Sequence, residues 1–417
     1  MPALPFAAVE QPVDEGLRLL TAGAVDVISV DELRRRLAGG RPLRVKLGID
    51  PTASDIHLGF AVVLRKLRQF QDLGHVAVLI VGDFTAQVGD PSGRSATRPR
   101  LTADEVDAFA ATYVEQVRRI LDFTPGRIEV RRNSEWLAGL GMEGVLRLMA
   151  STTVARMLER DDFAKRYRSG QPISLSEFLY PLLQGYDSVQ VRADVELGGS
   201  DQLFNNLMGR HLQEQAGQDP QVVLTTPLLE GLDGVQKMSK SLGNYVGIEE
   251  PGPEQFGKLM RIPDDVMPRY LELTTGWHPD HVADVLARLR DGRLKPVDAK
   301  RMLARRVVEL YHGDEAGVHA EAEFDRVFKA GDAPSEVADV AIPASEFADD
   351  GRVRLAKVLH LAGLVPSNKE GRRMIEQGGV RLDGERASDP DGEVSAADVD
   401  GVQVQVGKRR WARLHVR

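Results

Sequence analysis

Two stretches far apart in the chain carry residues suited to binding a nucleotide. The first is DPTASDIHLGF (50–60), in which His57 comes just before a predicted helix and Gly59 lies in its first turn. Backbone N–H groups at a helix N-terminus attract anions, and an imidazole N–H can add to them. Glycine leaves room for a flat base to approach the backbone. The stretch therefore indicates a phosphate-binding turn.

The second stretch is GVQKMSKSLGN (234–244), which places Lys237 and Lys240 between glycines with Ser239 and Ser241 beside them. Two cations on a glycine-flanked loop suit a mobile clamp on a polyphosphate. Each stretch alone has a plainer interpretation, a structural turn for the first and a solvated basic loop for the second. Together they favour one nucleotide site.

The rest of the sequence narrows the chemistry. There is no Walker-type glycine loop followed by Lys-Ser/Thr and no dinucleotide glycine fingerprint, which weakens the kinase and dehydrogenase interpretations. The chain has no cysteine, which excludes a disulfide framework, thiolate catalysis and a cysteine-ligated zinc site. The histidines are scattered, and we expect no dedicated protein site for a metal.

The elements that must position these residues follow from the apolar pattern. Residues 44–49 read as a buried strand, 58–74 as an amphipathic helix and 76–82 as a second buried strand, which makes a βαβ unit with a parallel sheet. Helical patterns dominate from 102 to 160 and from 175 to 189. A strand is predicted at 191–199, followed by a helix with Ser200 as N-cap, and another strand at QVVLTTPLL.

A chain of 417 residues exceeds the size of one ordinary hydrophobic core, so two or three domains are expected. Residues 352–417 carry 13 Lys and Arg and 9 Asp and Glu, a net of +4, which leaves −12 for residues 1–351. We predict an α/β fold: a Rossmann-like parallel-sheet catalytic domain with a helical insertion (1–248), a helical domain (249–330), a linker (331–351) and a small α+β domain (352–417). The basic charge of the last domain fits a phosphate-rich partner.

The N-terminal segment has no basic start followed by a long apolar run, and no later stretch reaches the roughly 18 apolar residues that span a membrane. We therefore expect a cytoplasmic protein without a membrane partner.

Five separated motifs, in the same order, resemble one family. HLGF is similar to the His-Ile-Gly-His motif, and KMSKS matches the second motif, of the class I aminoacyl-tRNA synthetases. KLGIDPTASDIHLGF, GDFTAQVGDPSGRS, LLQGYDSVQVRADVELGGSDQ and KMSKSLGN narrow the resemblance to the bacterial tyrosyl-tRNA synthetase family. LAKVLHLAGLVPSNKEGRRMIEQGGVRLDGE resembles the S4 RNA-binding domain at the C-terminus of that family.

The resemblance implies a tyrosine pocket. Tyr180, Gln184 and Asp187 are spaced by four and three residues, which puts them on one face of a helix. In the family that face lines the amino-acid pocket, with Asp187 accepting the phenol hydroxyl. Lys46 stands where many members place a tyrosine near that hydroxyl. The implied tyrosine-binding residues are Asp90, Tyr180, Gln184, Asp187 and Gln202.

The resemblance also implies an ATP site and a two-step reaction. The tyrosine carboxylate attacks the α-phosphate of ATP, and the adenylate then gives tyrosine to the 3′ end of tRNA(Tyr), with Mg²⁺ bound mainly by phosphates and water. The catalytic residues would be Thr52, His57, Lys237 and Lys240. ATP would meet Asp50, Pro51, His57, Gly59, Phe60, Asp201, Lys237, Ser239, Lys240 and Ser241.

Phe60 departs from the family, whose motif ends in a histidine facing the ribose. A working enzyme with weaker ATP handling is the first interpretation, and an impaired paralogue that binds RNA or regulates is an alternative. A nucleotidyltransferase acting on another small molecule is a third.

The family implies a homodimer and a tRNA-binding C-terminal module. Its candidate phosphate contacts are Arg372, Arg373, Lys408, Arg409 and Arg410. Deleting residues 352–417 is predicted to spare adenylate formation and to weaken tRNA charging.

Overall fold

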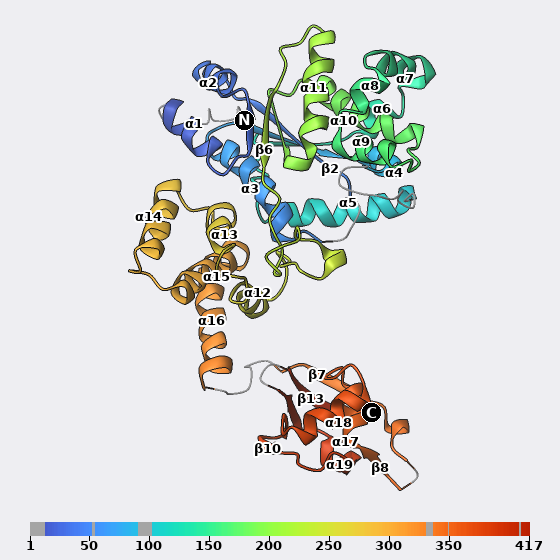
Figure 1. Ribbon diagram of the computed structural model, residues 1–417, viewed down its shortest axis with the longest axis vertical. Coiled ribbons are helices and arrows are strands. Elements are labelled where there is room, and N and C mark those ends of the chain that lie inside the picture. The colour runs from blue at the N-terminus through green and yellow to red at the C-terminus, as the bar shows by residue number, and fades with distance from the viewer. Residues whose placement is uncertain (1–12, 52–54, 91–101, 331–336, 349, 408–409) are drawn as a thin grey trace. The chain divides into compact units, whose positions relative to one another are not determined.

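The computed structural model describes residues 13–417 except 52–54, 91–101, 331–336, 349 and 408–409. It forms two compact units, Met1–Gly313 and Asp314–Arg417. Figure 1 shows the elements of each unit. None of the helices in this described part is both long and apolar enough to cross a membrane.

The first unit is built on a six-stranded sheet with the order β1-β6-β5-β2-β3-β4. Five strands run parallel, and β1 alone pairs antiparallel, with β6. The strands are β1 (Asp26–Ile28), β2 (Arg44–Ile49), β3 (Val76–Val81), β4 (Ile128–Arg132), β5 (Val195–Gly199) and β6 (Val222–Thr226). The predicted parallel Rossmann-like sheet is confirmed.

Two groups of helices cover this sheet. Helix α3 packs on β2, β3 and β5, while α10 packs on β2 and α11 on β5 and β6. The helices of the first part of the unit are α1 (Val13–Thr21), α2 (Val30–Ala38), α3 (Leu58–Asp72), α4 (Thr85–Val88), α5 (Ala103–Val117), α6 (Ser134–Leu137), α7 (Gly141–Ala150), α8 (Val154–Met157), α9 (Asp161–Arg168), α10 (Leu175–Val191) and α11 (Leu203–Gln215). The α2 helix is capped at its N-terminus, where the side chain of Ser29 accepts a hydrogen bond from the N–H of Glu32.

The strand order reverses beside β2. The chain runs from β2 outward to β3 and β4, and then returns to β5 and β6 on the other side of β2. In an open α/β sheet, ligands bind at the carboxyl edge of the strands at such a reversal. The carboxyl ends of β2 and β5 therefore mark where the site should be.

Three local predictions differ from the structure. The strand predicted at 191–199 begins only at Val195, because α10 continues to Val191. Ser200 does not cap a helix with its side chain; it opens a 3₁₀ turn, η1 (Ser200–Gln202), and α11 begins at Leu203. Strand β4 interrupts the stretch expected to be helical.

After the sheet the first unit is helical, as predicted. The helices are α12 (Gly252–Leu259), α13 (Met267–Thr274), α14 (Pro279–Arg290) and α15 (Pro296–His312).

The second unit contains a small α+β fold. Its core gathers apolar residues of helices and strands, among them Val358, Leu359, Val404 and Leu414. One sheet has the order β10-β9-β12-β13-β7 and a second pairs β11 with β8. The elements are α16 (Asp314–Asp325), a π-helical turn (Arg326–Ala330), β7 (Asp339–Ile342), β8 (Arg352–Arg354), α17 (Leu355–Leu361), α18 (Asn368–Glu376), β9 (Val380–Leu382), β10 (Glu385–Arg386), β11 (Glu393–Ser395), α19 (Ala396–Val399), β12 (Gln403–Val406) and β13 (Arg410–Val416).

Strand β7 falls within 331–351, the stretch interpreted from sequence as a linker. It pairs in parallel with β13, from Asp339 opposite Arg413 to Ile342 opposite Val416. The sheet of the C-terminal fold therefore includes residues before 352.

Candidate nucleotide and amino-acid site

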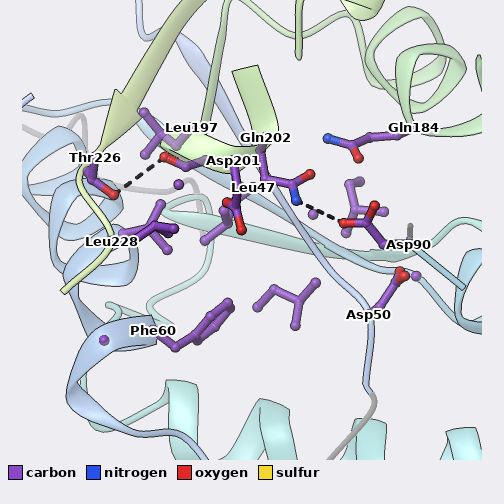
Figure 2. Close-up of a pocket in the computed structure, with 18 of the residues that line it drawn as sticks. Leu47, Asp50, Phe60, Asp90, Gln184, Leu197, Asp201, Gln202, Thr226 and Leu228 are labelled. Atoms are coloured by element: carbon purple, nitrogen blue, oxygen red, sulfur yellow. Dashed lines mark hydrogen bonds between the residues drawn. The ribbon is translucent and has the colours of Figure 1, made fainter. Parts of the chain in front are cut away.

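A cavity of ≈ 370 Å³ opens at the carboxyl edge of the sheet. This volume lies within the range of about 300–1,000 Å³ that is usual for small-molecule sites. Its walls come from the ends of β2, β3, β5 and β6 and from α3, α5 and α10. Figure 2 shows part of this lining.

The turn after β2 brings the first predicted motif to the cavity. His57 takes the N-cap position of α3 with extended backbone, and Gly59 follows in the first helical turn. A Cβ on Gly59 would lie 3.1 Å from Nδ1 of His57 and 3.2 Å from Cβ of Met238. Only glycine lets these two groups pack so closely.

Met238 joins the two motifs directly. The N–H of Gly59 donates to Sδ of Met238 at 3.3 Å, across 179 positions of the chain. Met238 is buried, and its neighbours Lys237 and Ser239 line the cavity with His57. The lysine-rich loop is thus packed against the first turn of α3.

His57 is held in its neutral form. Burial lowers its pKa to about 4, and the positive charges of Lys240 and Lys237 contribute to the shift. Its Nδ1 has no hydrogen-bond partner among the described residues. At neutral pH the ring therefore carries one N–H that a phosphate oxygen could accept.

The loop that carries the two lysines is shaped at its base by Asn244. Its Nδ2 donates to Oδ2 of Asp233 at 3.0 Å, and its Oδ1 accepts from the N–H of Ser239 at 2.8 Å. Gly234 and Gly243 take positive φ angles of 70° and 65° at the two ends of the loop. These contacts fix the loop at its base.

Both lysines lie beside carboxylates. Nζ of Lys240 is 2.7 Å from Oδ2 of Asp55, and Nζ of Lys237 is 3.7 Å from Oδ2 of Asp201. Burial raises the pKa of Asp201, and Lys237 opposes that shift. Phosphate oxygens brought to this loop would compete with these two carboxylates for the ammonium groups.

Phe60 lies in the first turn of α3 and lines the cavity (Figure 2). Its ring packs edge-to-face on Tyr113 of α5, with centroids 6.2 Å apart and planes at 90°. The aromatic contact holds the ring, which offers no hydrogen-bonding atom to a ligand.

A hydrogen-bonded group forms the opposite wall. The hydroxyl of Tyr180 donates to Oδ2 of Asp50 at 2.7 Å, and the hydroxyl of Thr85 donates to Oδ1 of the same carboxylate at 2.7 Å. A Cβ on Gly82 would lie 2.0 Å from Asp50 Oδ1, so only glycine fits there. Burial and then the charge of Asp50 raise the pKa of Tyr180 well above its usual value.

Amide side chains orient Asp90. Nε2 of Gln202 donates to Oδ2 of Asp90 at 2.8 Å, the bond drawn in Figure 2. Nδ2 of Asn205 donates to Oε1 of Gln202 and to Oε1 of Gln184, at 3.0 and 3.1 Å. The buried guanidinium of Arg160 lies 3.7 Å from Asp90. The carboxylate is thus fixed in one orientation at the edge of the cavity.

Asp187 lies at the closed end of the cavity. Nε1 of Trp136 donates to its Oδ1 at 2.8 Å, and Nδ2 of Asn133 donates to its Oδ2 at 3.3 Å. Burial raises the pKa of Asp187 to about 7, while Lys46 and the two donors lower it. A buried carboxylate of this kind is suited to accept a hydrogen bond from a neutral hydroxyl.

The cavity brings together most of the residues named from sequence. Its lining includes Asp50, His57, Gly59, Phe60, Asp90, Tyr180, Gln184, Asp187, Asp201, Gln202, Lys237 and Ser239. Pro51, Lys240 and Ser241 do not line it; Ser241 lies beside Ser239, with their hydroxyl oxygens 2.9 Å apart. Thr52 lies outside the described residues.

The sequence did not single out four contributors to this wall: Thr85, Asn133, Trp136 and Asn205. Asn133 and Trp136 follow β4 directly. Recognition of β4 as a strand of the parallel sheet would have pointed to them, because residues after such strands face the ligand edge.

Of the candidate phosphate contacts that the structure describes, Arg372 and Arg373 are exposed and Arg410 is partly exposed. Arg372 pairs with Asp391 at 2.9 Å and Arg373 with Glu370 at 2.7 Å, both at the surface. Arg410 donates to the carbonyl oxygen of Leu364 at 2.5 Å. Lys408 and Arg409 lie outside the described residues. Surface pairs are weak, so Arg372 and Arg373 can exchange partners at small cost.

Comparison with known proteins gives two family matches. The model described as "tRNA synthetases class I (W and Y)" matches residues 38–329, and the S4 domain model matches residues 353–400. The chain is 52% identical over 411 residues to "Tyrosine--tRNA ligase" of Moorella thermoacetica, covering 98% of this chain and 97% of that protein. It is 51% identical over 404 residues to the protein of the same name from Deinococcus radiodurans, covering 97% of both.

Solved structures share the fold. A tyrosyl-tRNA synthetase complexed with L-tyrosine from Archaeoglobus fulgidus aligns with a TM-score of 0.61 and 24% identity, over 74% of this chain and 100% of that chain. A C-terminally truncated mitochondrial tyrosyl-tRNA synthetase of Aspergillus nidulans aligns with a TM-score of 0.63 and 23% identity, over 76% of this chain and 94% of that chain.

Proposed function

The chain belongs to the tyrosine–tRNA ligases of the class I synthetase family, and from this premise we propose which residues carry each step of its reaction. Its function is to join tyrosine to tRNA with the use of ATP. The observation that carries the proposal is that His57, Lys237 and Asp187, from three distant segments of the chain, line the same cavity.

The first step is activation of tyrosine. The tyrosine carboxylate attacks the α-phosphorus of ATP, a new C(O)O–P bond forms, and the bond to the bridging oxygen of pyrophosphate breaks. A carboxylate is already ionised at neutral pH, so no general base is needed. Positioning and stabilisation of the charge that builds on pyrophosphate supply the rate enhancement.

We assign the phosphates to the first turn of α3 and to the lysine loop. The neutral ring of His57 donates one N–H, together with the backbone donors of the turn. Lys237 and Lys240 leave Asp201 and Asp55 to meet the pyrophosphate as its charge grows. Thr52 is proposed as a further donor. Asp201 would accept from the ribose, and Gly59 would admit the base.

Mg²⁺ is proposed to arrive with ATP, held mainly by phosphate oxygens and water, which are its preferred hard ligands. Within the described residues, no cluster of three or more His, Asp or Glu side chains forms a metal-binding group.

We assign tyrosine to the closed end of the cavity. Asp187 accepts the phenol hydroxyl, and Asp90, Tyr180, Gln184 and Gln202 receive the ammonium end. A pocket whose buried carboxylate needs a hydroxyl partner rejects phenylalanine, since phenylalanine leaves the carboxylate unpaired.

Transfer to tRNA is the second step: a terminal ribose hydroxyl attacks the carbonyl carbon of the adenylate, and AMP leaves. The helices from α12 to α15 and the S4 domain are proposed to bind tRNA(Tyr), with Arg372, Arg373, Lys408, Arg409 and Arg410 as phosphate contacts. The reaction serves translation, and we expect it in the cytoplasm; fractionation of the source cells would test this location.

We further propose a homodimer formed through α7. Met142, Leu146 and Met149 follow a helical spacing and are 74, 56 and 49% exposed, so the helix presents an apolar stripe to solvent. Exposed stripes of this kind often cover a protein interface.

The test of this assignment is exchange of labelled pyrophosphate into ATP, which needs no tRNA. Exchange should depend on tyrosine, and Lys237→Ala should slow it by on the order of 10²-fold, because one stabilising charge is removed from the transition state. Lys295 is exposed and does not line the cavity, so Lys295→Ala should leave the exchange rate unchanged.

Absence of tyrosine-dependent exchange in the full-length chain would count against catalysis by this protein. Exchange that depends on another amino acid would move the substrate assignment.

A further inference from the structure

A buried ion pair lies beneath the amino-acid end of the cavity. Lys46 in β2 and Glu196 in β5 are register partners of the parallel pair, so their side chains leave the sheet on the same face. Nζ of Lys46 lies 2.9 Å from Oε1 of Glu196, and the two side chains are 0% and 1% exposed. Charges this deep are costly unless every polar atom finds a partner.

Every donor of Lys46 is used. Besides Glu196, its ammonium donates to the hydroxyl oxygen of Ser188 and to the carbonyl oxygen of Gln184, both at 2.8 Å. Glu196 also accepts from the hydroxyl of Ser188 at 3.0 Å and from the side chain of Gln221. The ion pair is therefore fully integrated into one buried network.

This network fixes the turn of α10 that carries Asp187. Ser188 is the next residue, and Gln184 lies one turn earlier. Nε2 of Gln184 lies 3.3 Å from Oε1 of Glu196 as a donor, and its Oε1 accepts from Asn205. The pair thus fixes the amide orientation of Gln184 and the backbone on both sides of Asp187.

Lys46 does not line the cavity, although its place in the sequence suggested a position near the substrate hydroxyl. Since its three donors are occupied behind α10, direct contact with the substrate would break the network. Its influence on the substrate must pass through Asp187 and Gln184.

The charges around Asp187 give this influence a direction. Lys46 from β2 lowers the pKa of Asp187, and Glu196 from β5 raises it. Trp136 and Asn133 donate neutral hydrogen bonds from the segment after β4. On α10 itself, Tyr180 is the titratable neighbour, with Asp50 and Asp90 beyond it.

We propose that Lys46 and Glu196 are positioning residues that set the charge and orientation of Asp187, and that they thereby set the preference for tyrosine over phenylalanine. The proposal rests on the assignment of Asp187 to the tyrosine hydroxyl. A protonated Asp187 no longer needs a hydroxyl donor, so it discriminates less well against phenylalanine. Lys46 and Glu196 act in opposite directions on the protonation equilibrium of Asp187.

The experiment measures kcat/KM for tyrosine and for phenylalanine in pyrophosphate exchange by the full-length chain, from about pH 5.5 to about pH 9. The two substrates share the ionisations of the α-amino and α-carboxyl groups, and the tyrosine phenol, with a pKa of about 10, stays largely protonated over this range, so the ratio isolates the group that faces the hydroxyl. In the unmodified chain the ratio should rise with pH through one midpoint, as Asp187 loses its proton.

Lys46→Met should move this midpoint upward by roughly one pH unit, and the ratio should fall roughly tenfold at pH values below it. Glu196→Gln keeps the shape of the side chain, although one acceptor oxygen becomes an amide donor, and it removes the negative charge, so it should move the midpoint downward. The double variant, which combines Lys46→Met and Glu196→Gln, should have a midpoint between those of the two single variants. If the pair had a purely structural role, the variants would lower kcat/KM for both substrates together and would not shift the midpoint in opposite directions.

Lys66→Met is the matched control. Lys66 is also buried, but its ammonium donates to the carbonyl oxygens of Leu19 and Ala22 and the residue does not line the cavity. It should leave the midpoint unchanged. Shifts in the same direction for the two single variants, or no shift in either, would overturn the proposal.

If Lys46→Met does not fold, Glu196→Gln decides alone, and an unmoved midpoint in that variant counts against the proposal. Measurements on the unmodified chain distinguish a failure of the proposed function from a failure of the proposal about the ion pair. Lack of tyrosine use there would contradict the function assigned to the cavity, whereas tyrosine use with a ratio that is flat in pH would contradict only the role of the ion pair.

Discussion

Phe60 occupies the last position of the first motif, where the family resemblance would place a histidine. Its ring lines the cavity on the same wall as Gly59 and is held by the edge-to-face contact with Tyr113. The contact keeps a flat surface beside the nucleotide, so the substitution preserves shape. It removes a nitrogen that could bond the ribose.

Phe60→His should therefore improve ATP use. A hydrogen bond to a neutral partner is worth about 0.5–1.5 kcal/mol, so kcat/KM for ATP in pyrophosphate exchange should rise roughly two- to tenfold. The measurement is the ATP dependence of the exchange rate at saturating tyrosine.

Phe60→Leu is the control, because it keeps apolar bulk without a ring or a ring nitrogen. It should lower ATP use or leave it unchanged. An unchanged ATP dependence in Phe60→His would show that Phe60 has replaced the histidine without loss.

Residue types and spacing were sufficient to predict that His57, Gly59 and Lys237 come together, as they do in the lining of the cavity, because all three belong to short motifs. They were not sufficient for Trp136 and Asn133, whose bonds to Asp187 depend on where β4 ends. Lys46 shows the same limit. Its place in the sequence suggested a position near the substrate hydroxyl, but its register with Glu196 places its side chain behind α10.

At the scale of elements, segments with a clear apolar or amphipathic pattern were predictable, whereas β1, β4 and β7 were not. Strand β2 and helix α3 occupy the ranges expected, because burial and amphipathic spacing specify them locally. Strand β1 has three residues and β4 five, and each is stabilised mainly by pairing with a distant strand. Such pairing leaves little periodic signal in the sequence. Strand β7 was missed within an acidic, Pro- and Gly-bearing stretch for the same reason.

The apolar stripe of α7 gives a prediction that belongs to this scale. If α7 packs against a second copy, Leu146→Glu should convert the dimer to a monomer, because a buried unpaired charge costs several kcal/mol. Sedimentation or light scattering at micromolar concentrations would measure the mass. Val297→Glu, at a comparably exposed position on α15, should leave the dimer intact. A monomeric unmodified chain, or an unaffected dimer in Leu146→Glu, would refute the role of α7.

At the scale of the whole molecule, the change of net charge near residue 352 falls inside the second unit and does not coincide with the boundary between the two units at Gly313. The acidic residues 1–351 contain the cavity, and the basic residues 352–417 lie in the unit that carries the S4 match. Composition alone indicates this difference in charge. It did not predict the boundary, since β7 belongs to the same sheet as β13.

The boundary changes the design of the deletion experiment. A chain that ends at residue 351 keeps β7 but loses β13, which exposes an unpaired apolar strand and favours aggregation. A chain that ends at residue 330 lacks the whole sheet of the second unit and retains the segment matched by the synthetase family model.

We expect this shorter chain to exchange pyrophosphate at a rate within about twofold of the full-length chain, because the cavity is intact. Its kcat/KM for charging tRNA should fall by on the order of tenfold or more, since phosphate contacts are lost, and its dependence on salt should become shallower. In the full-length chain, the double variant Arg372→Gln with Arg373→Gln should also lower kcat/KM for charging tRNA, by a smaller factor than the truncation. Equal charging by the shortened and full-length chains, at matched salt, would exclude a role for the second unit in binding tRNA.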